Sequence, residues 1–551
     1  MKHLLQHWVT RQAETRPEAV ALVMGVDSLR YGQLETLSNQ LAHLLNRAGC
    51  RKGDRVCFLM PKSFAAIVSV IGILKAGCIH VPLDPTSPPL RMRKIIESCE
   101  NRWLLAAGPV ASSLSNLLED SLASRISVGW LEREKPRATS FRIEWSLEDV
   151  LLAETTQPSV DASTTDPAHI LFTSGSTGVP KGVVITHSNV SHFVEWSVRH
   201  FGIDSSDRLS GHTPLHFDLS TFDVFGTFAA GAELHMLPQD TALSPLKLAE
   251  FVRTSRLTQW FSVPSVLNYM AKSDVLRSHD FPALKRVLWC GEVLPTPALI
   301  YWMRRLPHVR FTNLYGPTEA TIASSFYDVP ECPVDEKAPI PIGLACDGEE
   351  LLILDQNLQP VSPGEVGDLY ISGAGLSPGY WHDPERTAAV FLPDPRHSTA
   401  NNRIYRSGDL ARRGDDGMIY FVGRQDAQIK SRGYRIELGE IEAALSSLPC
   451  LEESAAIAIE TSGFEGWLIC CAYVVQPGSQ CAPSGLRKDL AKHLPSYMIP
   501  SRWMEHQALP KNANGKIDRP KLKELFLKAE TFSRAELCRS SENAPSVEQF
   551  R

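Results

Sequence analysis

The chain has 551 residues, of which 43% are hydrophobic and 21% charged, and its formal net charge is −6. This length exceeds what one hydrophobic core usually serves, so we expect two or more lobes, and the balanced charge excludes a basic face for nucleic acid. Twelve cysteines without a CxxC pair favour reduced thiols in a cytoplasmic protein over disulfides or zinc, and no apolar run approaches the roughly 20 residues of a membrane span.

The first half of the chain predicts an α/β sheet protein. Residues 55–83 combine a strand (56–60), an apolar helix (64–74) and a second strand (78–83), which is a βαβ pattern. Further short apolar runs precede polar or Gly-rich turns at 170–173, 287–290 and 311–314. In such sheets ligands bind near the ends of the strands.

The second half predicts two different regions. Past residue 340 we expect strands without intervening helices (351–354, 368–372 and a hairpin turning at 415–417), hence a β-rich subdomain. After residue 423 we expect a charged loop, a helix (437–445), two strands (455–459 and 468–475) and a helix (486–493), hence a small α+β lobe. The predicted domains are a large one (1–425) and a small one (426–530), and the polar tail (531–551) is predicted to be disordered.

A glycine-rich loop follows the apolar strand at 170–172. It reads TSGSTGVPKG over residues 173–182, and its hydroxyl side chains, backbone N–H groups and lysine suit the binding of a polyphosphate. The spacing is not that of a Walker A loop, and an ordinary exposed turn is the alternative. The candidate phosphate ligands are Thr173, Ser174, Gly175, Ser176, Thr177, Gly178 and Lys181.

This loop resembles the signature of the adenylate-forming superfamily, which includes acyl-CoA synthetases, luciferases and the adenylation domains of nonribosomal peptide synthetases. Further segments resemble its motifs in order, up to about residue 525: LKAGCIHVP (74–82), NLYGPTE (313–319), YRSGDL (405–410), GRQDAQIKSRGYRIE (423–437) and NGK (514–516). The resemblance implies a large N-terminal domain of αβαβα sheets with a β-barrel-like subdomain, and a small, mobile α+β C-terminal domain. It also implies an ATP-dependent, AMP-forming ligase.

Attack of a carboxylate on the α-phosphorus of ATP brings two anions together, so the site must supply cations and positioned donors. The resemblance assigns this role to Lys516, for which an ordinary surface lysine is the alternative. It implies that Glu319 holds Mg²⁺ and that Thr318 meets the α-phosphate. The remaining implied nucleotide ligands are Gly291, Asn313, Tyr315, Gly316, Asp409 and Arg424, with Tyr315 and Asn313 at the adenine and Asp409 at the ribose.

The segment HFDLSTFD (216–223) resembles the start of the amino-acid pocket of peptide synthetases, where an aspartate at the position of Asp218 pairs with the substrate α-amino group. A buried carboxylate is costly without a partner, so Asp218 favours an amino acid over a fatty or aryl acid. An aspartate capping the following helix is the alternative. Phe217 is expected to gate the pocket, and the implied lining is Leu219, Phe222, Phe261, Leu288, Cys290, Leu314, Ile322 and Ala323.

This apolar lining predicts a small or medium apolar substrate, and the set looks most like that of stand-alone proline:carrier-protein ligases. It departs from that group at Phe261, Cys290, Ile322 and Ala323, so alanine, 2-aminobutyrate, valine and pipecolate remain competing substrates beside L-proline. An acyl-CoA synthetase and a luciferase-like oxygenase are the rival activities, and Asp218 argues against both. A non-catalytic ligand sensor is expected to have lost Lys516 or Glu319, and the sequence has both.

The second predicted half-reaction involves a phosphopantetheine thiol. No serine motif for this arm occurs in the sequence, so a peptidyl carrier protein is expected to act in trans. The resemblance implies that the small domain turns about a hinge at Asp426 and that Gly433, in the GYR segment, comes close to the pantetheine, since a residue without Cβ permits close backbone approach.

Overall fold

The computed structural model describes residues 4–119, 122–136, 141–175, 178–238, 241, 244–397, 402–461, 466–512 and 517–529. The chain forms two compact units. The larger comprises Met1–Thr173 and Pro180–Asp426, and the smaller comprises Ser174–Val179 and Ala427–Arg551. The tail that was predicted to be disordered (531–551) lies outside the described residues.

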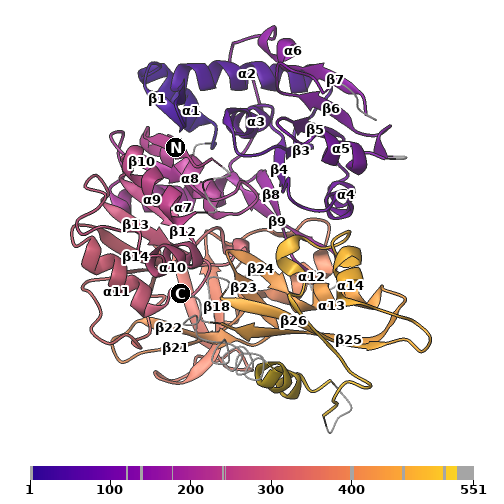
Figure 1. Ribbon diagram of the computed structural model, residues 1–551. Helices are drawn as coiled ribbons and strands as arrows, with labels where there is room; N and C mark the ends of the chain where they lie inside the picture. Colours follow the sequence, from indigo (N-terminus) through magenta and orange to yellow (C-terminus); the bar gives the residue numbers. More distant parts are fainter. Residues whose placement is uncertain are drawn as a thin grey trace, which may run out of the picture. The chain divides into compact units, whose positions relative to one another are not determined.

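Two large, mainly parallel sheets dominate the larger unit (Figure 1). The nine-stranded sheet has the order β16 (Leu344–Ala345), β15 (Ser325–Asp328), β14 (Arg310–Tyr315), β13 (Arg286–Trp289), β12 (Gln259–Ser262), β10 (Arg208–Gly211), β11 (Glu233–Met236), β1 (Val20–Met24) and β2 (Asp27–Arg30). The eight-stranded sheet has the order β19 (Gly379–Tyr380), β9 (Lys181–Thr186), β8 (Pro167–Thr173), β4 (Ile79–Leu83), β3 (Arg55–Leu59), β5 (Trp103–Ala106), β6 (Ser127–Trp130) and β7 (Ile143–Ser146).

In the described residues up to Arg305, eleven α-helices connect and flank these strands. They are α1 (His7–Thr15), α2 (Tyr31–Arg47), α3 (Phe64–Lys75), α4 (Pro89–Ser98), α5 (Ala111–Leu117), α6 (Leu147–Leu151), α7 (His187–Phe201), α8 (Leu219–Ala230), α9 (Pro245–Thr254), α10 (Pro264–Lys272) and α11 (Thr296–Arg305). The predicted βαβ unit is confirmed, because β3 and β4 lie side by side in parallel with α3 between them in the chain. Helix α3 is apolar nearly all round and is buried accordingly.

The layers follow from the two-residue alternation of side chains along each strand. On β3, Val56 and Phe58 join one hydrophobic cluster while Cys57 and Leu59 join another. The first of these clusters also receives α2, α3, α7, α8 and one face of the nine-stranded sheet. The second receives α4 and α5, and a third holds α9, α10 and α11 against the opposite face of the nine-stranded sheet. Helices therefore cover both faces of both sheets, and the predicted αβαβα arrangement is confirmed.

The β-rich subdomain is a five-stranded antiparallel sheet. It consists of β17 (Glu349–Leu354), β18 (Val366–Gly373), β21 (Arg403–Arg413), β20 (Phe391–Pro393) and β22 (Ile419–Arg424). The expectation of strands without intervening helices was wrong, because α12 (Pro384–Val390) lies between β19 and β20. Asp383 caps this helix through the N–H group of Arg386, and Pro384 stands at its first position, where its missing N–H costs nothing.

The smaller unit combines helices with two antiparallel or mixed sheets. A hairpin pairs β23 (Gln428–Ser431) with β24 (Tyr434–Glu437), and a three-stranded sheet joins β25 (Leu451–Glu460), β26 (Trp467–Val475) and β27 (Arg502–Glu505). Its helices are α13 (Leu438–Ser446), α14 (Pro483–Leu490) and a helical segment at 519–529. The charged loop predicted after residue 423 is thus a hairpin, whose two loop residues, Arg432 and Gly433, have the left-handed φ angles (53° and 81°) that tight hairpins use.

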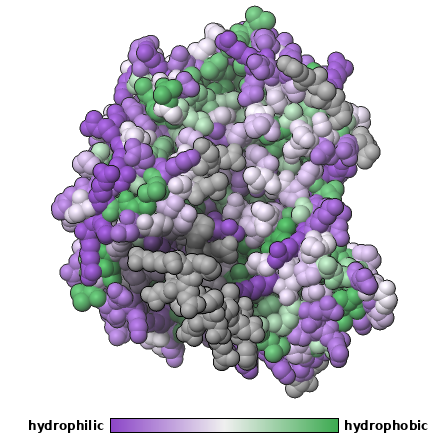
Figure 2. Space-filling model, viewed as in Figure 1, coloured by the Kyte–Doolittle hydropathy of each residue, from purple (hydrophilic) through white to green (hydrophobic). Residues whose placement is uncertain are grey.

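The described residues contain no helix that is both long enough and apolar enough to cross a membrane. In the face drawn in Figure 2, hydrophobic residues form small separate groups among hydrophilic ones. Isolated exposed side chains such as Val26 and Val334 are ordinary for a folded protein.

Candidate functional site

A lysine, a glutamate and a tyrosine meet at the edge of the eight-stranded sheet. Lys181 begins β9, and Glu319 lies in the short helix η3 (Thr318–Ala320). The Lys181 ammonium donates to Glu319 Oε1 at 3.0 Å, and the Tyr380 hydroxyl donates to the same oxygen at 2.8 Å. Glu319 is fully buried, and such a carboxylate needs these partners. Tyr380 was not predicted; it reaches the site because β19 pairs with β9, which sets Tyr380 opposite Val183.

These side chains are of the types that bind phosphate and Mg²⁺. Thr173 pairs with Lys181 across the β8–β9 ladder, and its buried hydroxyl has no partner within the described chain, so it fits a phosphate oxygen. Glu319 supplies the hard carboxylate oxygen that Mg²⁺ takes in combination with phosphates and water. Among the described residues, no group of three or more His, Cys, Asp or Glu side chains could hold a metal ion.

The structure does not test several of the other predicted ligands. Ser176 and Thr177 lie outside the described residues, and so does Lys516. Ser174, Gly175 and Gly178 group with the smaller unit, in which the Ser174 hydroxyl donates to the carbonyl oxygen of Arg435 at 2.5 Å. The roles of all these residues stay predictions.

Three of the predicted nucleotide ligands, Tyr315, Asp409 and Arg424, form one hydrogen-bonded chain. Asp409, on β21, accepts from the Tyr315 hydroxyl at 2.5 Å and from Arg424 Nη1 at 2.7 Å. Arg424 also donates through Nε to Asp426 at 2.9 Å. Burial, and after it the charge of Asp409, raises the pKa of Tyr315 well above its usual value, so this phenol stays a hydrogen-bond donor. The chain thus links the predicted ribose carboxylate to the predicted hinge residue, which is the last residue of the larger unit.

Three other predicted nucleotide ligands lie on neighbouring strand ends. The Asn313 amide donates to the carbonyl oxygen of Pro341 at 2.8 Å. Gly316 follows β14, and a Cβ there would lie 2.5 Å from the Cα of Ala323, so close packing by itself requires glycine. Gly291 follows β13 with a φ of 99°, which disfavours any residue with a side chain.

Asp218 sits next to the first turn of α8 but does not cap it. Its backbone is helical and its carboxylate makes no capping hydrogen bond, so the alternative of a capping aspartate is not borne out. Instead Asp218 Oδ2 accepts from the Thr318 hydroxyl at 2.7 Å. The residue predicted to hold the amino group of the substrate is therefore bonded to the residue predicted to meet the α-phosphate. The ring of Phe217, the expected gate, lies against His216, with centroids 4.6 Å apart.

All eight predicted lining residues belong to one buried hydrophobic cluster between the two large sheets. Phe261 and Leu288 are register partners on β12 and β13, and the rings of Phe222 and Phe261 meet edge to face with centroids 5.7 Å apart. The cluster members from this set are Leu219, Phe222, Phe261, Leu288, Cys290, Leu314, Ile322 and Ala323. Residues up to 104 positions apart in the sequence thus share one hydrophobic cluster, and their role as a substrate pocket stays a prediction.

The turn after η3 carries backbone strain. Thr321 and Ile322 both have left-handed φ angles, 57° and 73°, which are genuine outliers for β-branched residues. The Thr321 hydroxyl donates to the carbonyl oxygen of Gly375 at 2.6 Å, and this bond helps to hold the turn. Strain of this kind persists where the surrounding structure enforces it and is frequent at binding sites.

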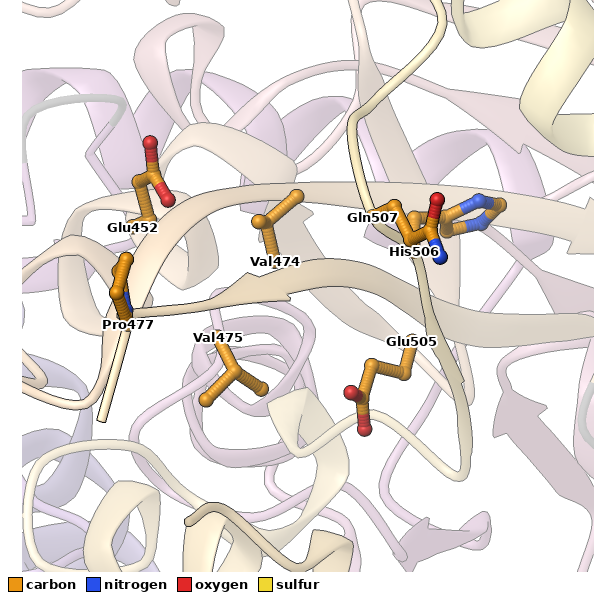
Figure 3. A pocket seen from close by; sticks show the side chains of 7 residues that line it. All are labelled: Glu452, Val474, Val475, Pro477, Glu505, His506 and Gln507. Carbon is orange, nitrogen blue, oxygen red and sulfur yellow. The ribbon is translucent and has the colours of Figure 1, made fainter. Parts of the chain in front are cut away.

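A surface hollow of about 420 Å³ lies on β25, β26 and β27 of the smaller unit. Figure 3 shows its lining, which is Glu452, Val474, Val475, Pro477, Glu505, His506 and Gln507. This lining contains none of the residues predicted to bind ATP, the amino acid or the carrier protein.

Comparison with known proteins gives consistent matches along the chain. Residues 9–381 match the family model of AMP-binding enzymes, and residues 440–516 match that of the AMP-binding enzyme C-terminal domain. The chain is 33% identical over 526 residues to an L-proline--[L-prolyl-carrier protein] ligase of Streptomyces coelicolor, covering 92% of this chain and 94% of the ligase. It is 34% identical over 521 residues to a dimodular nonribosomal peptide synthase of Bacillus subtilis, covering 94% of this chain.

The chain spans only 21% of that synthase and even less of other peptide synthases that it matches. Among solved structures, it is similar to the Vibrio cholerae adenylation domain AlmE, determined in complex with glycyl-adenosine-5'-phosphate. The TM-score is 0.81 at 25% identity, and the match covers 95% of this chain and 98% of that domain.

Proposed function

Because the chain belongs to the family of AMP-binding enzymes and is an ATP-dependent, AMP-forming ligase, we propose that it activates a small apolar amino acid, with L-proline as the best candidate. Its chemistry is adenylate formation on an amino acid. The substrate carboxylate oxygen bonds to the α-phosphorus of ATP, and the bond to pyrophosphate breaks, which yields an aminoacyl-AMP. We further propose that the thiol of a carrier-bound phosphopantetheine then attacks the acyl carbon and AMP leaves.

One observation carries the proposal. A carboxylate, Asp218, borders a fully buried apolar cluster and is bonded to Thr318, next to the Lys181–Glu319 pair. A carboxylate in such surroundings recognises an ammonium group, and the apolar side chains that follow it suit a substrate without a polar side chain. The relatives agree with this, since one is a proline ligase and another was solved with a glycyl adenylate.

The proposed role of each residue follows from the chemistry of its side chain. Lys181 and the Thr173 hydroxyl would bind phosphate oxygens, where a cation and a donor offset the growing negative charge. Glu319 would hold Mg²⁺, which when bound supplies positive charge to the phosphates. Asp409 and Arg424 would hold the ribose, and Tyr315 the adenine. Lys516, supplied by the C-terminal domain, would reach the substrate carboxylate, and Gly433 would face the pantetheine after rotation at Asp426.

The test is amino-acid-dependent exchange of pyrophosphate into ATP over a panel of amino acids. L-proline should give the fastest exchange, with alanine, 2-aminobutyrate, valine and pipecolate slower, because one methylene is worth only about 1 to 3 kcal/mol of discrimination. Asp218→Asn should abolish the exchange, whereas the matched change Asp204→Asn, on an exposed loop, should leave it intact. Fastest exchange with a charged amino acid, serine or cysteine would contradict the substrate assignment.

The acceptor is tested separately. The purified enzyme, ATP and L-proline are incubated with either a phosphopantetheine-loaded carrier protein or free coenzyme A. Aminoacylation of the carrier, detected by intact mass, supports the proposed partner. Transfer to coenzyme A alone would favour the acyl-CoA synthetase alternative.

A further inference from the structure

The segment that carries Asp218 has no regular secondary structure. Residues 212–218 connect β10 to α8 without forming a helix or a strand. Part of its backbone is bonded locally, since the N–H of Phe217 donates to the carbonyl oxygen of Pro214 at 3.0 Å, and its other polar groups also need partners. Two side chains, Lys62 and Asp223, bond the backbone at the start of the segment, at Gly211 and Thr213.

Lys62 holds the beginning of the segment. It follows β3 in the chain, and its ammonium group donates to the carbonyl oxygen of Gly211 at 2.6 Å. The same carbonyl also accepts a hydrogen bond from the N–H of Leu237, the residue after β11, at 3.1 Å. The loss of water around the ammonium group lowers the pKa of Lys62 to about 8, and the charge of Asp223 opposes this shift.

Asp223 holds the segment from its other end. It lies on α8, just beyond Asp218, and accepts a long hydrogen bond (3.4 Å) from the N–H of Thr213, ten residues earlier in the chain. Asp223 is only 3% exposed. Burial raises its pKa to about 8, and Lys62 and the Thr213 N–H oppose the rise. The hydrogen bond between Thr213 and Asp223 therefore closes a loop that contains Asp218, and Lys62 bonds the chain just before this loop, at Gly211.

The other titratable groups around the segment are His212, His216 and Asp84. Burial, with Lys62 adding to it, lowers the pKa of His212 to about 3. The pKa of His216 is lowered as well, mainly by burial, although Asp84 opposes this from 3.9 Å. Both imidazoles are therefore neutral at pH 7. The hydrogen bonds of Lys62 and Asp223 to the backbone add little net stability, but they restrict its geometry.

We propose that Lys62 and Asp223 are positioning residues for amino-acid recognition, which fix residues 211–223 so that the Asp218 carboxylate stays beside Thr318. They do not touch the substrate; they act through the backbone of this segment. The inference rests on the proposed function, in which Asp218 binds the amino group of the substrate. It adds the specific claim that the affinity for the amino acid, rather than that for ATP, depends on these two side chains.

The first measurement does not depend on the substrate. Hydrogen exchange of the full-length protein is compared for wild type, Lys62→Met and Asp223→Asn, which keep the size of the side chains. Amides of 211–218 should exchange about 10-fold faster or more in both variants, as expected on losing a hydrogen bond to a charged group, while amides of β13 should be unchanged. The matched control is Lys75→Met, because Lys75 is buried against Glu35 at 2.6 Å and burial lowers its pKa to about 8 too, but it lies on α3.

The second measurement is kinetic. In Lys62→Met the KM for the amino acid should rise roughly 10-fold or more with the KM for ATP little changed, and Lys62→Arg should restore most of the affinity. Equal exchange at 211–218 in wild type and variants would overturn the inference, and so would faster exchange with an unchanged amino-acid KM. A wild-type protein without any amino-acid-dependent activity would instead contradict the proposed function, while hydrogen exchange would still decide whether the pair fixes the segment.

Discussion

The hydrogen bond between Thr318 and Asp218 should couple the two substrate sites energetically. Replacing Thr318 by Val keeps the shape of the side chain and removes the hydroxyl that lies 2.7 Å from Asp218 Oδ2. A hydrogen bond to a charged acceptor contributes about 1.5 to 3 kcal/mol, so Thr318→Val should weaken binding of the aminoacyl-adenylate roughly 10- to 150-fold. In an Asp218→Asn background the hydroxyl no longer meets a charge, and its removal should cost much less.

The assay is a double-mutant cycle on the dissociation constant of a non-hydrolysable aminoacyl-adenylate analogue, measured by calorimetry so that inactive variants can be included. We expect a coupling energy of about 1 kcal/mol or more between the two substitutions, because residues in direct contact are not additive. Effects that add within about 0.5 kcal/mol, as for distant residues, would refute this reasoning. They would mean that the contact does not persist when the adenylate is bound.

Three further predictions use other parts of the chain. Tyr380→Phe removes one of the hydrogen-bond donors to the buried Glu319 carboxylate. This change should lower kcat/KM for pyrophosphate exchange about 10-fold or more. An unchanged kcat/KM would exclude a role for the Tyr380 hydroxyl. Burial keeps the pKa of His80 well below its usual value and lowers that of His169 to about 3, so the unfolded chain binds more protons than the folded chain below pH 6.5. The free energy of unfolding, measured by urea titration, should therefore be constant above pH 6.5 and lower by about 2 kcal/mol for each histidine at pH 5. A free energy of unfolding that does not change between pH 7.5 and 5 would contradict this. Lys516→Ala should reduce adenylate formation by orders of magnitude yet spare loading of the carrier from preformed adenylate, and equal loss of both half-reactions would argue against it.

Parts of the fold were predictable where a local pattern decides the structure. The strand at 56–60 and the helix at 64–74 are almost wholly apolar, and such runs are typical of elements that are buried inside a layered α/β domain. The hairpin of β23 and β24 was missed because each strand has only four residues, of which only one is aliphatic. Its turn, Arg432–Gly433, also lacks the Asn-Gly or Asp-Gly signal that marks such turns in a sequence.

In the candidate site, too, local sequence motifs could be recognised and long-range contacts could not. Asp218, Glu319 and Asp409 could be predicted because each stands in a motif whose letters are contiguous in the chain. Tyr380 and Lys62 could not, since Tyr380 meets Glu319 across 61 residues and Lys62 meets Gly211 across 149. Such contacts are set by strand register and by the packing of layers, neither of which a single sequence displays.

The turn that follows β14 contains residues that were predicted for two different ligands. Within six residues it presents Thr318 and Glu319 on the predicted phosphate side, and Ile322 and Ala323 in the apolar cluster. The reversal between the two sides occurs at Thr321 and Ile322, whose left-handed backbone conformations are costly for β-branched residues. A relaxed backbone at these positions would point the side chains elsewhere, so the strained turn is what allows one short segment to contribute residues to both predicted sites.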